Sequence, residues 1–300
     1  MSGPKKREAP RKEQPSTYFV QDRENKEELQ RLIGQDRMIT TRMGGPLPEQ
    51  DGPALFHRVL DIGCGPGGWI MEAAQMYPHM CLFGIDISRR MIAYAREQAA
   101  SQGLSGRVEF HVMDALLKLE FPSDFFDLVN LRLGSSWMRK WNWPELLLEM
   151  LRVTRPGGVV RLTEIEVIQP SNSEAHQRFC QMILCALFRA GHFFEQESTG
   201  ITTHLAPLLK QHGCLQVQEK PYALEFKAGT SEIQAYIEDS RHVIRTFQPF
   251  LQKWGCLSIE NYKAFSRKFL TEIGRDDFHV TWNFLTAWGN KPDVSNQVGK

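Results

Sequence analysis

The sequence predicts an α/β fold in which helices cover both faces of a mostly parallel sheet. Three observations lead to this prediction. Short apolar segments alternate with segments of helical periodicity through the first half of the chain. A glycine-dense turn, V-L-D-I-G-C-G-P-G-G at residues 59–68, joins the first apolar segment to a helix. Acidic residues then close the next two apolar segments, at the positions where the ligand-binding edge of a parallel sheet is expected.

The first half of the chain begins with a helix and continues as alternating strands and helices. The first helix is expected over residues 25–43, where apolar residues recur every three to four positions and Gly44-Gly45-Pro46 ends the pattern. The expected strands are residues 58–62, 81–85, 108–113, 126–131 and 159–165. The expected helices between them are residues 67–76, 89–102 and 143–153, the last one closed by Arg155-Pro156-Gly157-Gly158.

The second half is less regular. Helical patterns cover residues 173–194, 199–212, 230–254 and 258–273, and strand patterns cover residues 215–226 and 278–288. The two late strands most simply extend the same sheet, with the helices between them as a cap. Residues 1–16 are rich in Lys, Arg, Pro and Glu and are expected to be a disordered tail. We expect one domain over residues 17–300, with a core at 56–166 and cap segments at 17–46, 170–212 and 229–276.

The glycine-dense loop is expected to bind a small ligand, most simply a nucleoside. Glycines accept positive φ and let the backbone approach a ligand that a Cβ would block. The first amides of the following helix are unpaired and face whatever lies at the loop. A structural turn alone would need one glycine, whereas this loop has four, at positions 63, 65, 67 and 68.

Polar residues at three further strand ends extend this site. Asp86 ends L-F-G-I-D, about twenty residues past the loop, where an acidic side chain can accept both ribose hydroxyls. Asp114 ends V-E-F-H-V-M-D and could accept from an exocyclic adenine amine, with the Ala115 N–H directed to the ring. Asn130-Leu131-Arg132 ends the fourth strand. Asp and Asn are also common turn formers, so the prediction depends on the whole ordered set.

A dinucleotide-dependent oxidoreductase is the alternative, because Gly63, Gly65 and Gly68 also fit the pattern G-x-G-x-x-G. Asp61, two residues before the first glycine, argues against it. A carboxylate there would repel a doubly charged pyrophosphate, whereas it would attract a ligand that carries an ammonium and a sulfonium.

The segments V-L-D-I-G-C-G-P-G-G, G-I-D-I-S, V-M-D-A and L-R-V-T-R-P-G-G-V-V together resemble the class I S-adenosylmethionine-dependent methyltransferases. Within that family the resemblance is to the ubiquinone/menaquinone-biosynthesis type and its small-molecule relatives, and it covers residues 56–166. It implies a Rossmann-like sheet of seven strands, with the last strand antiparallel, under a helical cap. It also implies that S-adenosylmethionine is the cofactor.

The resemblance further implies where that cofactor binds. Asp61 and Gly63 would hold its methionine end, which Leu131 and Arg132 would border. Asp86 would hold the ribose, and Asp114 with Ala115 the adenine. Gly44-Gly45 resembles an upstream segment that covers the cofactor. The full set of expected cofactor-binding residues is Asp61, Gly63, Gly65, Gly67, Asp86, Ile87, Asp114, Ala115, Leu131 and Arg132.

The implied activity is methyl transfer to a small, largely apolar metabolite, aromatic or isoprenoid-like. Transfer from a sulfonium depends mainly on alignment, and a base is needed only for an acceptor of high pKa. No catalytic residue is assigned. Glu164 is considered for orienting a substrate hydroxyl or amine, or else as a buried carboxylate paired with an arginine. Five histidines are weaker candidates for a base: His176, His192, His204, His242 and His279.

The acceptor is expected to lie against the cap, because aromatic and methionine side chains gather there. The alternative is that these side chains are only the core of the cap. The side chains in question are Phe179, Met182, Ile183, Leu187, Phe188, Phe193 and Phe194, together with Trp137, Trp141 and Trp143 before them.

Composition limits the remaining classes of function. The net charge of +1 argues against a nucleic-acid partner, and no apolar run is long enough to span a membrane. The six cysteines form no C-x-x-C pair, so we expect no metal site. We also expect a reduced, cytoplasmic location, because nothing indicates a disulfide framework. The protein is expected to be a monomer or a homodimer. Three alternatives remain open: a non-catalytic S-adenosylmethionine-binding regulator, the NAD(P)-dependent oxidoreductase, and an RNA methyltransferase that uses the basic residues 5–12.

Overall fold

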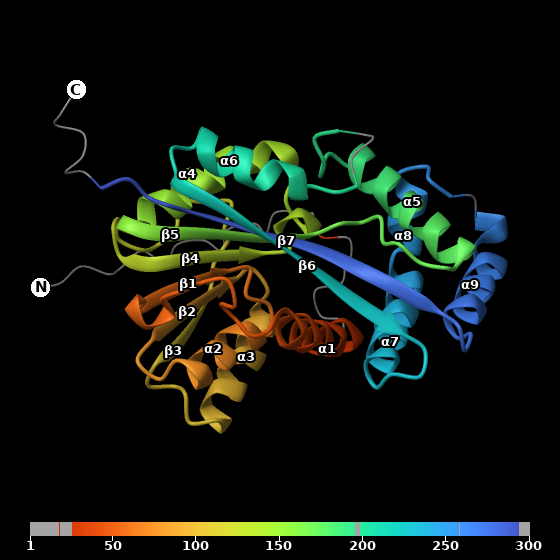
Figure 1. Cartoon of the computed structure of the whole chain (residues 1–300), viewed down its shortest axis with the longest axis horizontal. Helices are drawn as coiled ribbons and strands as arrows, with labels where there is room; N and C mark the ends of the chain where they lie inside the picture. Colours follow the sequence, from red (N-terminus) through yellow and green to blue (C-terminus); the bar gives the residue numbers. More distant parts are fainter. Residues whose placement is uncertain (1–17, 19–25, 196–198, 258, 294–300) are drawn as a thin grey trace, which may run out of the picture.

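The computed structural model describes residue 18 and residues 26–195, 199–257 and 259–293, so the tail expected at residues 1–16 lies outside the described part. Seven strands form one sheet: β1 (Arg58–Ile62), β2 (Cys81–Asp86), β3 (Val108–Val112), β4 (Phe126–Arg132), β5 (Thr154–Ile165), β6 (Leu215–Lys227) and β7 (His279–Asn290). Their order is β3-β2-β1-β4-β5-β7-β6 (Figure 1). β1 to β5 are parallel, and β7 is antiparallel to both of its neighbours. The predicted Rossmann-like sheet with an antiparallel last strand is confirmed.

Helices cover both faces of this sheet. α2 (Gly68–Met76) and α3 (Arg89–Ser101) pack on one face, and α4 (Trp143–Val153) and α6 (Leu205–Gln211) pack on the other (Figure 1). The face that carries α4 shares a continuous apolar cluster with the cap helices, in which Trp143 and Leu162 join Phe179 and Phe269. The sheet and the cap are therefore stabilised by the same buried apolar surface.

The cap helices gather at one end of the molecule, around the extended ends of β6 and β7 (Figure 1). They are α5 (Glu174–Arg189), α7 (Glu232–Thr246), α8 (Gln248–Lys253) and α9 (Ile259–Ile273). α1 (Lys26–Met43) packs against both α2 and α7, so it bridges the sheet and the cap. None of the helices in the described ranges is long and apolar enough to cross a membrane.

Two helices differ from the sequence prediction because of single residues. The helix expected over residues 230–254 is interrupted between α7 and α8, since Pro249 lies in the first turn of α8 and cannot donate the hydrogen bond that a continuous helix needs. The helix expected over residues 173–194 ends at Arg189. Gly191 there adopts a φ of 83°, and the N–H of His192 donates to the Leu187 carbonyl at 2.9 Å.

The turn predicted at Arg155-Pro156-Gly157-Gly158 lies inside β5 rather than before it. Thr154 pairs with Phe126 of β4, and the next pair is Val159 with Leu128. The four turn residues therefore form a bulge at the start of β5. The expected helix over residues 199–212 is also shorter, a single 3-10 turn (Thr202–His204) followed by α6.

A row of buried polar side chains crosses the three central strands. Asp61 on β1, Asn130 on β4 and Arg161 on β5 occupy paired positions in the sheet. The Asn130 amide donates to Asp61 at 2.7 Å and accepts from Arg161 Nη1 at 2.7 Å. Arg161 also donates to both oxygens of Glu49 in the segment before β1, at 2.6 and 3.1 Å. The hydrogen-bonded row Glu49–Arg161–Asn130–Asp61 thus links the segment before β1 to Asp61, near the carboxyl end of β1.

Replacing Arg161 with methionine should destabilise the protein strongly. The Glu49 and Arg161 side chains are 0 and 1 % exposed, so the variant leaves a buried carboxylate unpaired. We expect the free energy of unfolding to fall by about 3–5 kcal/mol, measured by chemical denaturation.

The matched control is Arg155→Met on the same strand. Arg155 pairs with Asp127, but its side chain is 40 % exposed, and the buried Asp127 carboxylate also accepts from the backbone N–H groups of His57 and Arg58. Because Asp127 keeps these donors, the loss of Arg155 should destabilise the protein less than the loss of Arg161. Equal losses in the two variants would contradict the importance assigned to the buried row.

Candidate functional site

A cavity of about 600 Å³ lies where the carboxyl ends of the parallel strands meet α1 and the cap. This volume falls within the range of about 300–1,000 Å³ that is typical of small-molecule sites. One side of the cavity is lined by the ends of β1, β2 and β4 and the residues that follow β3. The opposite side, which we call the cap end, is lined by residues of α1, α5, α7, α9 and β7.

The glycine loop lies at the strand side of the cavity. Gly63, Gly65 and Gly67 adopt φ values of 68, 52 and 79°, a region that disfavours other residues. Gly63 and Gly65 line the cavity. A Cβ on Gly63 would lie 3.4 Å from the Trp137 ring, so this glycine also lets the tryptophan approach the loop.

Asp86, at the end of β2, lines the cavity and holds the glycine loop. Its Oδ2 accepts from the Gly65 N–H at 3.0 Å, and its Oδ1 accepts from the Ser88 N–H at 2.7 Å. Asp86 therefore fixes the loop from a position that lines the cavity.

Asp114, Ala115 and Ile87 line the cavity beyond Asp86. Asp114 Oδ1 accepts from the Leu116 N–H at 3.0 Å, which closes a tight turn after β3. The side chains of Ile87 and Leu117 are 38 and 48 % exposed beside this turn. The arrangement offers an acidic acceptor between two apolar surfaces, which suits a flat heteroaromatic ring with an amino group.

Asp61 is a buried acid at the strand side of the cavity. The residue is 4 % exposed, and burial raises the pKa of its carboxyl to about 7, against the lowering effects of Arg132 and Asn130. The carboxylate therefore lacks full compensation for its lost hydration. A cationic group that entered the cavity next to Asp61 would favour the charged form.

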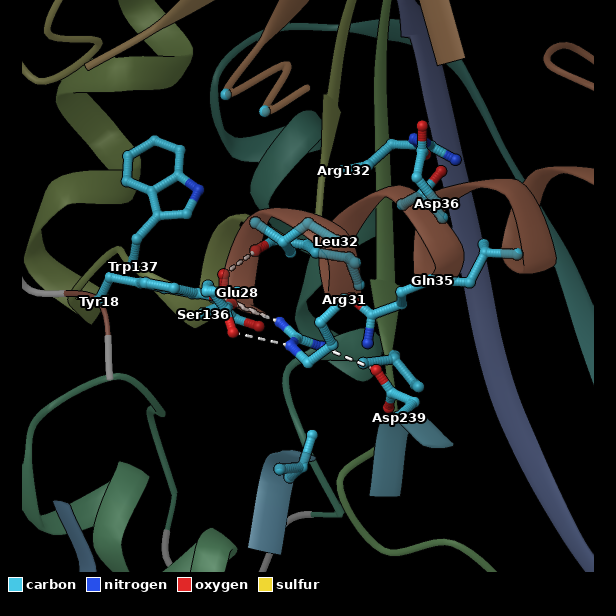
Figure 2. A pocket seen from close by; sticks show the side chains of 18 of the residues that line it. Tyr18, Glu28, Arg31, Leu32, Gln35, Asp36, Arg132, Ser136, Trp137 and Asp239 are labelled. Atoms are coloured by element: carbon cyan, nitrogen blue, oxygen red, sulfur yellow. Dashed lines mark hydrogen bonds and ion pairs between the residues drawn. The ribbon is translucent and has the colours of Figure 1, made fainter. Parts of the chain in front are cut away.

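The side chain of Arg132, at the end of β4, contacts residues of both α1 and α2. It forms an ion pair with Asp36 of α1 (Figure 2). It also donates to Thr40 Oγ1 on the same helix at 3.0 Å. Its guanidinium lies 5.8 Å from the centre of the Trp69 ring on α2. The Asp36 carboxylate also lies against Gly68, at the start of α2, a site that favours negative charge. Asp36 and Arg132 thus hold α1 across the strand ends.

Two of the ten predicted site residues do not line the cavity. Gly67 lies behind the loop, where a Cβ would come within 2.6 Å of the Phe110 ring. Leu131 is 1 % exposed and belongs to the apolar core. Both residues pack behind the residues that line the cavity. The Gly44-Gly45 segment also does not line the cavity; Asp36 and Ile39, one to two turns earlier on α1, do.

Glu164 has a different role from either of the two expected. It does not line the cavity and is not paired with an arginine. Its carboxylate accepts from the Ser135 N–H at 3.0 Å and the Ser135 hydroxyl at 2.6 Å, and burial raises its pKa to about 7. His192 contacts the Ser135 carbonyl at 2.8 Å through Nδ1. Both residues fix the turn that carries Ser136 and Trp137 into the cavity.

Among the five histidines, only His176 lines the cavity. Burial lowers its pKa to about 4, and its Nδ1 lies 3.0 Å from the Ser171 hydroxyl. Of the expected aromatic and apolar residues, Phe179, Ile183, Leu187, Phe193 and Trp137 line the cavity. Trp143 is core and Trp141 is 61 % exposed, so these two do not.

Sequence reasoning missed the polar residues that α1 and α7 contribute. These are Glu28, Arg31, Gln35, Asp239 and Ser240. Asp239 lies between Tyr236 and Val243 at helical spacing, so a buried acid on an apolar helix face was the available signal. Within the described ranges, no group of three or more His, Cys, Asp or Glu residues could hold a metal ion.

Comparison with known proteins agrees with this geometry. Residues 59–158 match the family model described as a methyltransferase domain. Over 129 residues, the chain is 32 % identical to methyltransferase GfsG of Streptomyces halstedii, which covers 42 % of this chain and 44 % of GfsG. Over 186 residues, it is 28 % identical to the ubiquinone/menaquinone biosynthesis C-methyltransferase UbiE of Pseudomonas putida, covering 62 % of this chain and 69 % of UbiE. The match thus spans less than half of GfsG.

A similar fold is found in phosphoethanolamine N-methyltransferase 2 of Haemonchus contortus, solved with phosphomonomethylethanolamine and S-adenosylhomocysteine. The TM-score is 0.52 at 22 % identity, over 92 % of this chain and 60 % of that one. The family match covers the glycine loop and the strand-end acids, and the solved structure has the same fold. The chain thus has a match to a methyltransferase domain over residues 59–158 and is similar to S-adenosylmethionine-dependent methyltransferases in sequence and fold.

Proposed function

We propose that the protein transfers a methyl group from S-adenosylmethionine to a small, largely apolar metabolite. The observation that carries this proposal is the continuity of the cavity. Asp61, Asp86 and Asp114 line its strand side, and aromatic side chains such as Phe179 and Phe269 line its cap end. A polar cofactor and an apolar acceptor could therefore meet without crossing solvent.

The proposed cofactor position follows the order of the strand ends. The ammonium of the methionine end binds Asp61 beside Gly63, and its carboxylate approaches Arg132 in competition with Asp36. Gly65 and Asp86 hold the ribose. Asp114 and the Ala115 N–H bind the adenine, with Ile87 against its ring.

The proposed division of the chain is one domain over residues 17–300. The core at 56–166 supplies the cofactor side. The cap segments at 17–46, 170–212 and 229–276 supply the acceptor side, since they contain α1, α5, α7 and α9. The proposal is supported by the shared apolar cluster, which includes both Leu162 of β5 and Phe179 of α5.

The proposed reaction is an in-line displacement. The acceptor's electron pair forms a bond to the methyl carbon as the carbon–sulfur bond breaks, and the sulfonium leaves as a neutral thioether. The protein's contribution is to align the three atoms and exclude water, which can supply about 7–11 kcal/mol of the barrier reduction. His176 lines the cap end as a neutral imidazole and could accept a proton from a hydroxyl acceptor, but burial, which lowers its pKa to about 4, makes it a weak base.

The function is tested by turnover. Purified protein is incubated with methyl-labelled S-adenosylmethionine and a panel of small aromatic and isoprenoid hydroxyl and amine compounds. We expect labelled product and S-adenosylhomocysteine to form in equal amounts with at least one member of the panel. Cofactor binding without any product from the panel would favour the non-catalytic regulator, and absence of cofactor binding would refute the proposal.

Asp86→Ala should weaken S-adenosylhomocysteine binding by about tenfold or more, because each charge-assisted hydrogen bond to a ribose hydroxyl contributes about 1.5–3 kcal/mol. The variant also releases the Gly65 and Ser88 amides that Asp86 holds. Isothermal titration calorimetry measures the change. Asp51→Ala is the control, an exposed acid before β1, and should bind normally. Unchanged affinity in Asp86→Ala would refute the ribose assignment.

Cofactor affinity should fall as the pH drops below 7. The pKa of Asp61 is raised to about 7 in the free protein, so its carboxylate becomes protonated at lower pH and must ionise again before it can bind an ammonium. We expect the affinity for S-adenosylhomocysteine to fall by up to roughly tenfold per pH unit between pH 6.5 and 5.5. Calorimetry across this range measures it.

The control is Asp61→Asn, which lacks the titrating group. It should bind more weakly at pH 7.5, and its affinity should change little down to pH 5.5. Parallel pH profiles for the two proteins would contradict the assignment of Asp61 to the ammonium.

A further inference from the structure

A cluster of three buried charged residues lies at the cap end of the cavity. Arg31 of α1 lies between Glu28, on the same helix, and Asp239 of α7 (Figure 2). The side chains are 4, 4 and 8 % exposed, respectively, and all three residues line the cavity. Two carboxylates thus share one guanidinium in a place with little access to water.

The two carboxylates differ in how well they are satisfied. Glu28 accepts from Arg31 Nε at 2.9 Å and Nη2 at 2.7 Å, and from the Tyr18 hydroxyl at 2.7 Å. His242 Nε2 lies 3.0 Å from its second oxygen. Asp239 accepts one hydrogen bond, from Arg31 Nη1 to Oδ1 at 3.0 Å. Within the described part of the chain, Asp239 Oδ2 has no hydrogen-bond partner, although the residue is more than nine-tenths buried.

Aromatic side chains line the same end of the cavity as Asp239. Tyr236, Asp239 and Val243 follow one another on one face of α7 at spacings of three to four residues, Phe247 comes directly after the helix, and all four line the cavity. Neighbouring elements add further rings to this wall: Phe179, Phe269, Trp282 and Phe284. A carboxylate bordered by ring faces is a favourable site for an ammonium group, which is attracted by both.

The charge of the whole cavity favours a cation in the same way. Two guanidinium groups line it in the described residues, and both are already engaged: Arg31 with Glu28 and Asp239, and Arg132 with Asp36. Seven carboxylates line it: Glu28, Asp36, Asp61, Asp86, Asp114, Glu166 and Asp239. An anionic acceptor would meet this excess of negative charge without an available cation.

We propose that the acceptor substrate carries a basic amine, and that its ammonium group binds Asp239 Oδ2 among the rings of the cap end. This inference rests on the proposed function, since it names the class of molecule that the methyltransferase would accept. A bound ammonium would give the Asp239–Arg31–Glu28 cluster one cation for each carboxylate. Burial raises the pKa of Asp239 even though the nearby Arg31 lowers it. This direction agrees with a carboxylate whose charge is not fully compensated by one guanidinium.

The test uses three small probes of similar size: 2-phenylethylamine, 2-phenylethanol and 3-phenylpropanoate. At pH 7.5 they carry an ammonium, a neutral hydroxyl and a carboxylate, respectively. Full-length protein is first titrated with S-adenosylhomocysteine, and each probe is then titrated into the saturated complex. We expect the amine to bind about tenfold more tightly than the alcohol, and the carboxylate to bind most weakly.

Asp239→Asn removes the charge while keeping the size of the side chain. In this variant the preference for the amine over the alcohol should disappear, while the affinity for S-adenosylhomocysteine stays unchanged. Asp127→Asn is the matched control, because Asp127 also pairs with an arginine, Arg155, but does not line the cavity. It should keep the amine preference.

The outcomes separate the two proposals. If S-adenosylhomocysteine does not bind, the proposed function fails. If it binds and the wild-type protein prefers the alcohol or the carboxylate, or shows no preference, the amine proposal fails while the methyltransferase proposal stands. This comparison needs no variant, so it holds even if Asp239→Asn does not fold. An amine preference that Asp239→Asn retains would refute the role of Asp239.

Discussion

The buried row Glu49–Arg161–Asn130–Asp61 is the interaction on which the site depends. It crosses three neighbouring strands at paired positions, and each member hydrogen-bonds to the next. Glu49 compensates the charge of the buried Arg161 guanidinium, and the Asn130 amide links Arg161 to Asp61. The row therefore fixes a carboxylate at the end of β1, in a place where burial alone would exclude one.

The cavity is completed by segments that are far apart in the sequence. α1 precedes the sheet and α7 follows β6, yet Arg31 and Asp239 join these helices across 208 positions. Asp36 joins α1 to β4 in the same way, through Arg132. Because α1 contacts both α2 and α7, it connects the strand side of the cavity to the cap end. The hydrogen bonds of Asp86 and Glu164 hold the loops of the cavity in place from behind.

The sequence predicted the sheet and the strand-end acids because these depend on local pattern. Strand, glycine turn and acid follow one another within a few residues, and parallel topology then brings them to one edge. The interruption at Pro249 was visible in the sequence, but the helical periodicity on both sides of it obscured it. Glu164 and Leu131 could not be placed, since the direction of a side chain at a strand end depends on the register with its neighbours.

The cap end could not be predicted from the sequence for a related reason. Arg31 and Glu28 read as ordinary polar positions of an amphipathic helix until α7 packs against them. Only the tertiary contact shows that Glu28 is saturated with donors and Asp239 is not. Local patterns thus indicated the strand side of the cavity, whereas the cap end is built from long-range contacts.

The pKa of the Asp61 carboxyl can be measured directly by an NMR titration of carboxyl-labelled aspartate, with the Asp61 signal assigned by comparison with Asp61→Asn. We expect the Asp61 carboxyl to have a pKa of about 7 in the free protein. This pKa should fall by at least one unit when S-adenosylhomocysteine binds, because an ammonium then faces the carboxylate. An ordinary aspartate pKa in the free protein, or a value that the ligand leaves unchanged, would contradict this expectation.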